Sequence, residues 1–179
     1  MLPVSPLAPE RFPDLPTVAG VALATAETGL KYRDRDDLLL IALAPGSAVA
    51  GVLTRSLTAS APVEWCRGAL AAGGRGRAIV VNAGNANAFT GRAGEDSVRR
   101  TADTAAQLLH CAPEEVYIAS TGVIGEPLDD GMNANALPNL AQTAAGPAWE
   151  AAAKAIMTTD TFPKGATRTA SIGGVEVRL

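Results

Sequence analysis

One short stretch of the 179-residue sequence constrains the fold most. Residues 115–118, Glu-Val-Tyr-Ile, form a β-branched and aromatic run that predicts a buried strand. Residues 119–125, Ala-Ser-Thr-Gly-Val-Ile-Gly, follow it, so the predicted strand ends on two hydroxyls and a glycine. Gly122 and Gly125 permit backbone conformations that other residues avoid, which allows peptide N–H groups to turn toward a ligand. The stretch predicts either a pocket where a hydroxyl and an N–H converge on one oxygen, or an ordinary strand-to-helix turn.

Composition indicates which side chains fill the core. Hydrophobic residues make up 47% of the chain but aromatic residues only 4%, so Ala, Val, Leu and Ile must supply most of the buried volume. Small side chains suit layers of sheet and helix that approach closely, and 179 residues can bury a sizeable core. Five prolines among residues 1–16 predict an extended surface segment, and residues 17–179 are expected to form a single α/β domain.

Charge, cysteine and histidine content exclude several classes of protein. A net charge of −3 without a long run of either sign argues against a nucleic-acid partner. Cys66 and Cys111 are too few for a disulfide framework, and the single histidine, His110, excludes a two-histidine metal site and a Ser-His-Asp triad within one chain. The sequence pattern contains neither a secretory signal nor a membrane span. We therefore expect a cytoplasmic protein with no metal, no cofactor and no membrane partner.

Hydrophobic periodicity predicts the order of the remaining elements. Cys66 is expected to be a small core residue of its helix, and His110 to end another helix, where the dipole favours a cation. We expect strands at residues 18–25, 38–44, 48–54 and 77–82, helices at 62–71, 94–109, 128–140 and 147–156, and strands at 168–172 and 175–179.

Two turn signals predict hairpins. Pro45 and Gly46 lie between the apolar runs 38–44 and 48–54, so we expect those runs to pair antiparallel. The glycine pair at residues 173–174 separates two alternating runs near the end of the chain. Two glycines suit the tight two-residue turns that join antiparallel strands.

Two further segments are predicted to be loops. Residues 32–37, Tyr-Arg-Asp-Arg-Asp-Asp, indicate a solvated connection rather than a binding patch. Residues 84–87, Gly-Asn-Ala-Asn, follow the clearest predicted strand, and Asn and Gly tolerate left-handed backbone. This second loop either lines a pocket or makes a compact turn, and no residue in it is assigned a role.

Three motifs occur in order along the chain: Asn-Ala-Gly-Asn-Ala-Asn-Ala-Phe-Thr-Gly at residues 82–91, Ser-Thr-Gly-Val-Ile-Gly at 120–125, and Ala-Ile-Met-Thr-Thr-Asp at 155–160. Together they resemble the N-terminal half of the glutamate N-acetyltransferase / ornithine acetyltransferase family of arginine biosynthesis. The likeness extends from about Thr17 to the last residue. It implies an α/β layered sandwich of mixed and antiparallel sheets covered by helices, similar to the self-cleaving ornithine acetyltransferase and aminopeptidase fold.

The resemblance also implies that this chain is one of two parts. In this family a precursor cleaves itself before a threonine to give an α and a β chain. The new N-terminal threonine of the β chain is the nucleophile, with its own α-amine as general base. The motif around that cleavage site does not occur in the present sequence, which ends on the apolar Leu179 inside the last predicted strand. We expect an α chain that is incomplete without its β chain, in a heterotetramer of two α and two β chains.

Site residues are carried over by position. Thr121 and Gly122 match the family's oxyanion hole, in which the threonine hydroxyl and the glycine N–H stabilise the tetrahedral intermediate. Thr158, the first threonine of Met-Thr-Thr-Asp, matches a substrate-binding threonine. Without the resemblance, Thr158 is equally well read as a residue that ends a helix by bonding its own backbone.

The implied reaction is acetyl transfer from N-acetylornithine to glutamate through an acetyl-threonine intermediate. Some members of the family also use acetyl-CoA as donor, and both donors stay open for this chain. Two other functions are kept as alternatives. One is an amidohydrolase or aminopeptidase of the same self-cleaving fold, in which water is the acceptor. The other is a non-catalytic domain that binds a small ligand or phosphate at residues 121–125.

Overall fold

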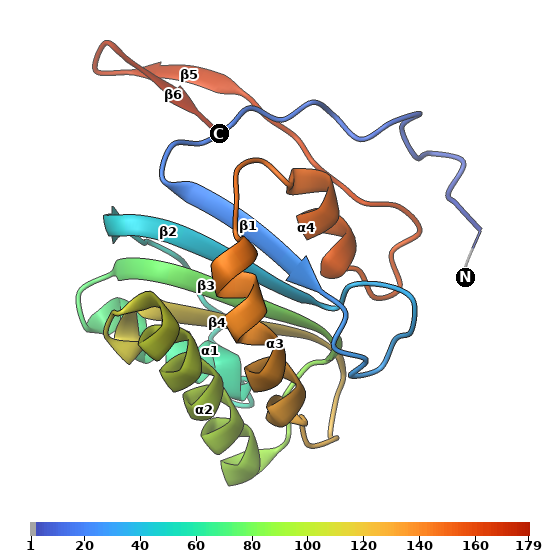
Figure 1. The fold of residues 1–179 in the computed structure, drawn as a ribbon, viewed down its shortest axis with the longest axis vertical. Helices are drawn as coiled ribbons and strands as arrows, with labels where there is room; N and C mark the ends of the chain where they lie inside the picture. Colours follow the sequence, from blue (N-terminus) through green and yellow to red (C-terminus); the bar gives the residue numbers. More distant parts are fainter. Residues whose placement is uncertain (1–2) are drawn as a thin grey trace.

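A four-stranded mixed sheet forms the centre of this computed structural model, which describes residues 3–179 (Figure 1). The strand order is β1 (Val21–Ala26), β2 (Leu38–Ala48), β3 (Arg75–Asn85) and β4 (Val116–Val123). β2 is antiparallel to both of its neighbours, and β4 is parallel to β3. The carboxyl ends of β1, β3 and β4 therefore lie at the same edge of the sheet.

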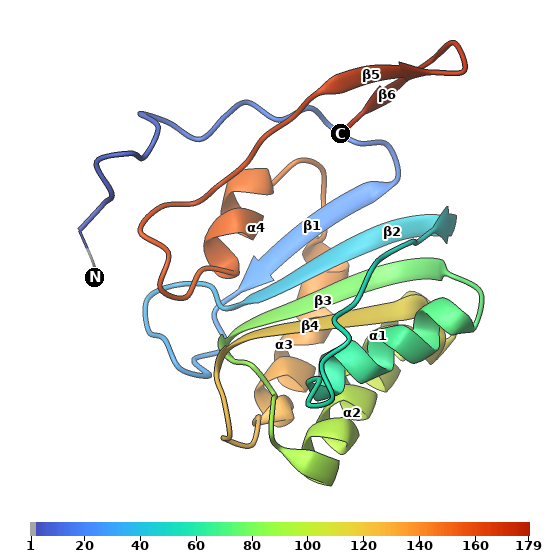
Figure 2. The same ribbon diagram turned by 180° about the vertical axis from the view of Figure 1, so that it is seen from behind.

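Three helices cover one face of the sheet: α1 (Ala61–Ala71), α2 (Gly91–Leu109) and α3 (Asp130–Thr143), as the two opposite views show (Figures 1 and 2). Every second residue of the strands points into this layer, and the helices contribute residues three or four apart. Alanines on α2 allow that helix to approach the strands closely. The buried core on this face includes Leu38, Leu40, Ala78, Val80, Val116 and Ile118 from the strands and Val98, Ala102, Ala105, Leu137 and Leu140 from the helices.

The opposite face is covered by a shorter helix, α4 (Trp149–Ala155), which packs over β1 and β2. Its Ala152 and Ala155 meet Leu23 and Leu39, the strand residues of opposite parity to those in the first core. The N-terminal segment passes along the outside of α4 (Figure 1). A hydrogen bond of 3.0 Å from Trp149 Nε1 to the Pro16 carbonyl joins the two.

The start of the chain has no regular structure where it is described. Residues 3–20 contain no helix or strand, and residues 1–2 of the expected extended segment 1–16 lie outside the described residues. None of the helices within residues 3–179 combines the length and apolarity needed to cross a membrane.

Pro45 and Gly46 lie inside β2 rather than at a reversal of the chain. The predicted hairpin is therefore wrong, and its second strand, 48–54, belongs mostly to the connection to α1. The pairing of β2 with β3 shifts register between Ala42 and Ser47, so the proline falls where the ladder is interrupted and its missing N–H costs no bond. Because β1 and β3 already flank β2, residues 48–54 find no place beside it.

The other predicted elements are present, with shifted bounds. A short 3₁₀ helix, η1 (Pro113–Glu115), precedes β4, and the predicted C-terminal hairpin forms from β5 (Thr169–Ile172) and β6 (Val175–Arg178). Its turn glycines have φ values of 59° and 81°, the left-handed conformation that the tight turn requires. The α/β class, with a mixed sheet covered by helices, is confirmed.

Candidate active site

Thr121 and Gly122 lie within β4, near its carboxyl end. The sequence predicts that this strand ends on Ser-Thr-Gly, but β4 continues to Val123. β3 is also longer than predicted and continues to Asn85, so it supplies partners for every residue of the motif. In this parallel pairing Thr121 is opposite Ala83 and Gly122 is opposite Gly84. The extension of β3 explains why the motif is strand rather than turn.

Gly122 is required by the neighbouring strand. A Cβ placed on Gly122 would lie 2.2 Å from the Gly84 carbonyl carbon and 2.5 Å from the Asn85 nitrogen, far inside van der Waals contact. Its φ of 136° is also one that side chains with a Cβ rarely adopt. Gly122 is exposed and Thr121 is half-buried, so both are open to a ligand at this edge.

The Thr121 hydroxyl differs from its neighbours in its contacts. Ser120 Oγ donates to Asn82 Oδ1 at 2.6 Å, whereas no group within residues 3–179 hydrogen-bonds to the Thr121 hydroxyl. Adjacent residues of a strand point to opposite faces. The Ser120 hydroxyl thus points toward the protein interior and is hydrogen-bonded there, while the Thr121 hydroxyl points to the other face and can bond to a ligand.

Buried asparagines connect the ends of β3 and β4. Asn82 and Asn85 are only 2% and 6% exposed. Asn82 Nδ2 donates to the Asn85 carbonyl at 2.9 Å, and Asn85 Nδ2 donates to the Glu126 carbonyl at 3.0 Å. Buried amides bonded in this way satisfy backbone carbonyls at the end of β3 and in the connection that follows β4. These residues support the edge where Thr121 lies.

Asn87 has the same role at the start of α2. It is fully buried, with its Nδ2 donating to the Gly94 carbonyl at 3.1 Å and its Oδ1 accepting from Thr90 Oγ1 at 2.8 Å. Its φ of 45° is left-handed, as the sequence predicts for asparagine here. The loop predicted at residues 84–87 is only partly present, because Gly84 and Asn85 belong to β3 and the irregular connection to α2 begins after Asn85. Three asparagines within residues 82–87 were the sequence signal that could have identified these supporting residues.

The connection from β1 to β2, residues 27–37, lies at the same edge. The buried Asp37 carboxylate accepts from Thr28 N at 2.7 Å, Thr28 Oγ1 at 2.8 Å and Leu30 N at 3.1 Å. The Ala83 N–H of β3 donates to the Asp37 carbonyl at 2.8 Å. The segment is a loop, as predicted, but Asp37 is not solvated, because it satisfies the N–H groups of the tight turn that follows β1.

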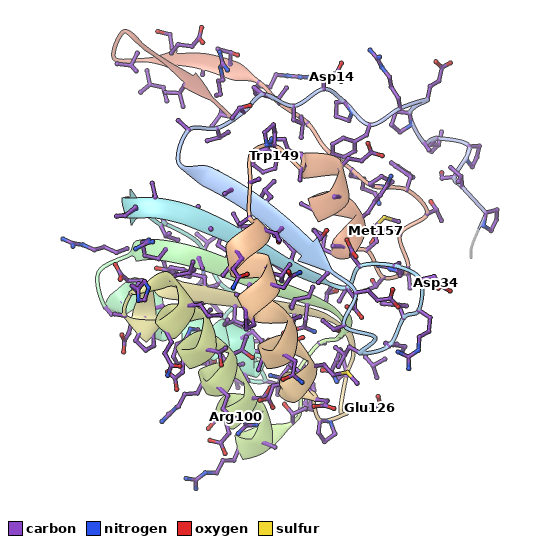
Figure 3. All side chains as sticks on the ribbon, in the orientation of Figure 1. Asp14, Asp34, Arg100, Glu126, Trp149 and Met157 are labelled. Carbon is purple, nitrogen blue, oxygen red and sulfur yellow. The ribbon has the colours of Figure 1, made fainter. Side chains whose placement is uncertain are left out.

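Thr158 follows the end of α4. It is half-buried, and its N–H donates to Asp160 Oδ2 at 3.4 Å. The other oxygen of that carboxylate, Asp160 Oδ1, is paired with Lys164 Nζ at 2.6 Å. Figure 3 places the neighbouring Met157 on the same side of the molecule as Asp34 and Glu126, the side where β1 and β3 end. Thr158 follows directly after Met157, and Thr121 and Gly122 lie near the carboxyl end of β4. Loop 27–37 contacts both Met157 and Gly84, the register partner of Gly122.

The family assignment comes from a sequence match over most of the chain. The sequence model of the ArgJ family matches residues 22–179. The chain belongs to the ArgJ family. This confirms the resemblance expected from the three motifs.

Two relatives named arginine biosynthesis bifunctional protein ArgJ are similar to this ArgJ chain. The one from Bradyrhizobium diazoefficiens is 56% identical over 176 residues, and the one from Rhizobium meliloti is 54% identical over 176 residues. Each match covers 98% of this chain but 42% of the relative. The chain thus spans less than half the length of these relatives.

Two solved structures have the same fold as this ArgJ chain. The arginine biosynthesis bifunctional protein of Bacillus halodurans aligns with a TM-score of 0.81 at 31% identity, covering 90% of this chain and 84% of the solved one. The ornithine acetyltransferase of Mycobacterium tuberculosis, complexed with ornithine, aligns with a TM-score of 0.75 at 33% identity, covering 84% and 80%. Both alignments confirm the α/β architecture.

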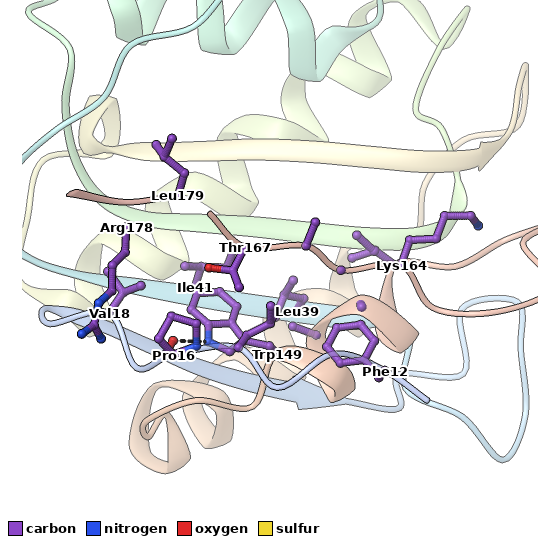
Figure 4. A pocket seen from close by; sticks show the side chains of 16 residues that line it. Phe12, Pro16, Val18, Leu39, Ile41, Trp149, Lys164, Thr167, Arg178 and Leu179 are labelled. Carbon is purple, nitrogen blue, oxygen red and sulfur yellow. Dashed lines mark hydrogen bonds between the residues drawn. The ribbon is translucent and has the colours of Figure 1, made fainter. Parts of the chain in front are cut away.

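An apolar pocket elsewhere in this ArgJ chain does not overlap with the predicted site (Figure 4). It lies between α4 and the two terminal segments and is lined by Phe12, Leu39, Trp149 and other apolar side chains. Lys164 and Arg178 are its charged residues. It contains no hydroxyl nucleophile paired with a base, and the Trp149 N–H is already bonded to Pro16 (Figure 4).

The thiols of this ArgJ chain are packing groups. Cys66 Sγ donates to the Ile118 carbonyl at 3.2 Å, and burial raises the pKa of the Cys66 thiol above its ordinary value. Burial also raises the pKa of the Cys111 thiol, and the negative charge of Glu115 raises it further. Raised pKa values disfavour the nucleophilic thiolate. His110 ends α2 in the left-handed conformation with φ of 51°, as expected for a helix terminus.

Proposed function

We propose that this chain is the α part of an enzyme that transfers an acetyl group from N-acetylornithine to glutamate. The observation that carries the proposal is the pair Thr121–Gly122, matched to the family motif and situated at the exposed carboxyl end of β4. The solved ornithine acetyltransferase was complexed with ornithine, the amine that this reaction releases. The relatives that match this chain are named arginine biosynthesis bifunctional protein ArgJ.

In the proposed mechanism the nucleophile is a threonine of the companion chain. Its Oγ attacks the acetyl carbonyl carbon of N-acetylornithine, and the carbonyl oxygen takes up negative charge. Collapse of this intermediate breaks the C–N bond, and ornithine leaves as its amine gains a proton. The glutamate amine then attacks the acetyl-threonine ester, forming N-acetylglutamate and regenerating the hydroxyl. Acetyl-CoA is an alternative donor to the same threonine.

Thr121 and Gly122 act on the charged oxygen in this proposal. A hydroxyl and a backbone N–H from adjacent residues give two donors in a fixed relation, because β4 is held by β3 on one side. Loss of one such donor costs about 2.7–4 kcal/mol of transition-state stabilisation. Thr158 is proposed to bind the acetylated amino acid, holding its reacting group near these donors.

A companion chain is supported by the lengths of the relatives. This chain covers 42% of the Bradyrhizobium protein but 84% of the solved Bacillus halodurans chain. A solved chain of about half the curated length is what cleavage of a precursor produces. We propose self-cleavage, a heterotetramer of two α and two β chains, and a cytoplasmic location. Within this chain, residues 17–179 are proposed to form a single domain, with 1–16 as an extended surface segment.

The experiment is to produce this chain together with the segment that follows residue 179 in its gene. The purified complex is given N-acetylornithine with and without glutamate, and ornithine and N-acetylglutamate are measured. Steady-state ornithine release that depends on glutamate supports transfer. Release at the same rate without glutamate identifies a hydrolase instead, and no turnover in either condition refutes the proposal.

A further inference from the structure

Arg35 reaches from the β1–β2 connection to the end of α4. Its Nη2 donates to the Met157 carbonyl and, at 3.3 Å, to the Lys154 carbonyl, more than a hundred residues away in sequence. Its guanidinium lies 4.2 Å from the centre of the Tyr32 ring. Arg35 is half-buried, although the sequence predicts a solvated loop here.

The Lys154 carbonyl belongs to the last turn of α4 and also accepts from the Met157 N–H at 3.2 Å, whereas the Met157 carbonyl lies two residues beyond the helix end at Ala155. The C-terminal end of a helix also carries partial negative charge, which favours a cation. Arg35 supplies both a charge and a donor to the chain at Met157. Thr158 is the next residue.

The same loop packs on the strand that lies beside Gly122. A Cβ on Gly84 would lie 2.8 Å from Lys31 Cβ and 3.4 Å from Tyr32 Cε2, so these side chains lie directly over that glycine. Gly84 is in turn paired with Gly122 in the β3–β4 ladder. The contacts run from Gly122 through Gly84 and Tyr32 to Arg35.

Asp37 holds the base of this loop in place through hydrogen bonds. Its buried carboxylate holds the N–H groups of Thr28 and Leu30, and its carbonyl is bonded to Ala83 of β3. Asp36 accepts a hydrogen bond from Thr25 of β1. The loop is therefore attached at its base to both strands, with Arg35 projecting toward α4.

We infer that Arg35 is a positioning residue that sets Thr158 relative to the Thr121–Gly122 pair. The inference rests on the proposed function for the roles of those residues, and on contacts of this chain for the positioning itself. Arg35 acts through Thr158, so its loss weakens substrate binding. It leaves the donors at Gly122 and Thr121 in place, so turnover at saturating substrate changes little.

The first test compares Arg35→Ala with Arg33→Ala in the complete complex. Arg33 is an exposed arginine of the same loop whose Nη1 donates only to Gly29, within that loop. We expect Arg35→Ala to raise KM for N-acetylornithine about tenfold and to change kcat by no more than about twofold. The tenfold rise corresponds to the free energy lost with one hydrogen bond to a charged group. Arg33→Ala should leave both unchanged. Equal effects of the two variants, or an unchanged KM in Arg35→Ala, would overturn the inference.

The second test asks whether Arg35 acts through Thr158. In a double-mutant cycle, Arg35→Ala should have a much smaller effect on KM when Thr158 is already alanine, because residues that act as one unit are not additive. Additive effects would show that Arg35 acts by another route. Arg35→Lys, which keeps the charge without the planar fork, should raise KM less than the alanine variant. A larger rise would also contradict the inference.

A third measurement does not depend on the reaction. Hydrogen exchange at residues 156–160 should be faster in Arg35→Ala than in the parent complex, and unchanged in Arg33→Ala. Unchanged exchange at these residues refutes the positioning even if the complex is inactive. A parent complex that does not release ornithine refutes the proposed function and leaves this exchange result to decide on Arg35.

Discussion

Gly122 and Gly84 lie against each other so closely that a Cβ on Gly122 would fall 2.2 Å from the Gly84 carbonyl carbon. The two glycines are register partners at the carboxyl ends of β4 and β3. Their contact brings the proposed donor pair directly beside the segment that carries the buried asparagines. The glycine of the Ser-Thr-Gly motif therefore has a packing role as well as a proposed catalytic one.

Substitution of Gly122 should destabilise the fold as well as inactivate the enzyme. Gly122→Ala introduces a clash with rigid backbone and an unfavourable φ, and we expect a loss of about 3 kcal/mol or more. Gly125→Ala is the matched control, since φ there is 84° but no heavy atom lies within 4 Å of the added Cβ. It should cost only about 1–2 kcal/mol. Denaturant unfolding measures both, and similar midpoints for the two variants would contradict the close contact.

Thr121→Ala should lower kcat far more than it raises KM, because the hydroxyl is needed mainly in the transition state. We expect a decrease in kcat of about 10²–10³-fold in the complete complex. Thr121→Ser keeps a hydroxyl and should retain most of the turnover. Steady-state kinetics with N-acetylornithine decide the matter, and an unchanged kcat in the alanine variant removes Thr121 from the mechanism.

Asn82→Ala should lower stability without removing a residue of the proposed chemistry. It leaves the Ser120 hydroxyl and the Asn85 carbonyl without their present partner, in a site where Asn82 is 2% exposed. Buried polar groups left unpaired cost about 1–3 kcal/mol each. Asn139→Ala, at an exposed position of α3, serves as the control. Thermal unfolding should separate the two variants, and equal melting temperatures would refute a supporting role for Asn82.

The pair Arg100–Asp130 predicts a pH dependence of stability. Arg100 Nε and Nη2 each lie 2.7 Å from an Asp130 carboxylate oxygen, and the hydrogen bonds from Arg100 lower the pKa of Asp130 below its ordinary value. A carboxyl with a lowered pKa stabilises the fold above its unfolded pKa and loses this effect as pH falls through the folded pKa. Asp130→Asn should therefore melt at a lower temperature than the parent at pH 7.

That difference should shrink as pH falls below the unfolded carboxyl pKa of about 3.9 and through the lower pKa of folded Asp130, where the parent carboxylate also becomes protonated. Melting temperatures of both proteins from neutral to acidic pH provide the measurement. High salt should reduce the difference at pH 7, because Arg100 is exposed. A difference that does not change with pH would show that the variant acts through packing instead.

The order of elements was predictable because local pattern controls it. Runs such as residues 78–81 are apolar at every position and form strands in most environments, and the spacing of Val98, Ala102 and Ala105 suits only a helix. The glycine pair at residues 173–174 was equally clear, since two left-handed residues in succession favour one turn type. The family motifs likewise depend on sequence order, so they identified the chain before its fold was known.

Which strands pair, and over what length, was not predictable from such local patterns. Pro45-Gly46 has the composition of a hairpin turn, yet it became a bulge because β1 and β3 flank β2. The Ser-Thr-Gly motif has the composition of a loop, yet it became strand because β3 extends beside it. In both cases a partner distant in sequence decided between two conformations of similar local free energy.

The sequence by itself determined the α/β class, the helices and most strands, and the candidate residues Thr121, Gly122 and Thr158. The roles of these three residues in acetyl transfer are proposed. Only the tertiary structure decided that loop 27–37 contacts both Met157 and Gly84 and that Arg35 holds the end of α4. The physical reason is that periodicity records which face of an element is buried, whereas the contact from Arg35 to Met157 depends on how two distant segments meet over the sheet.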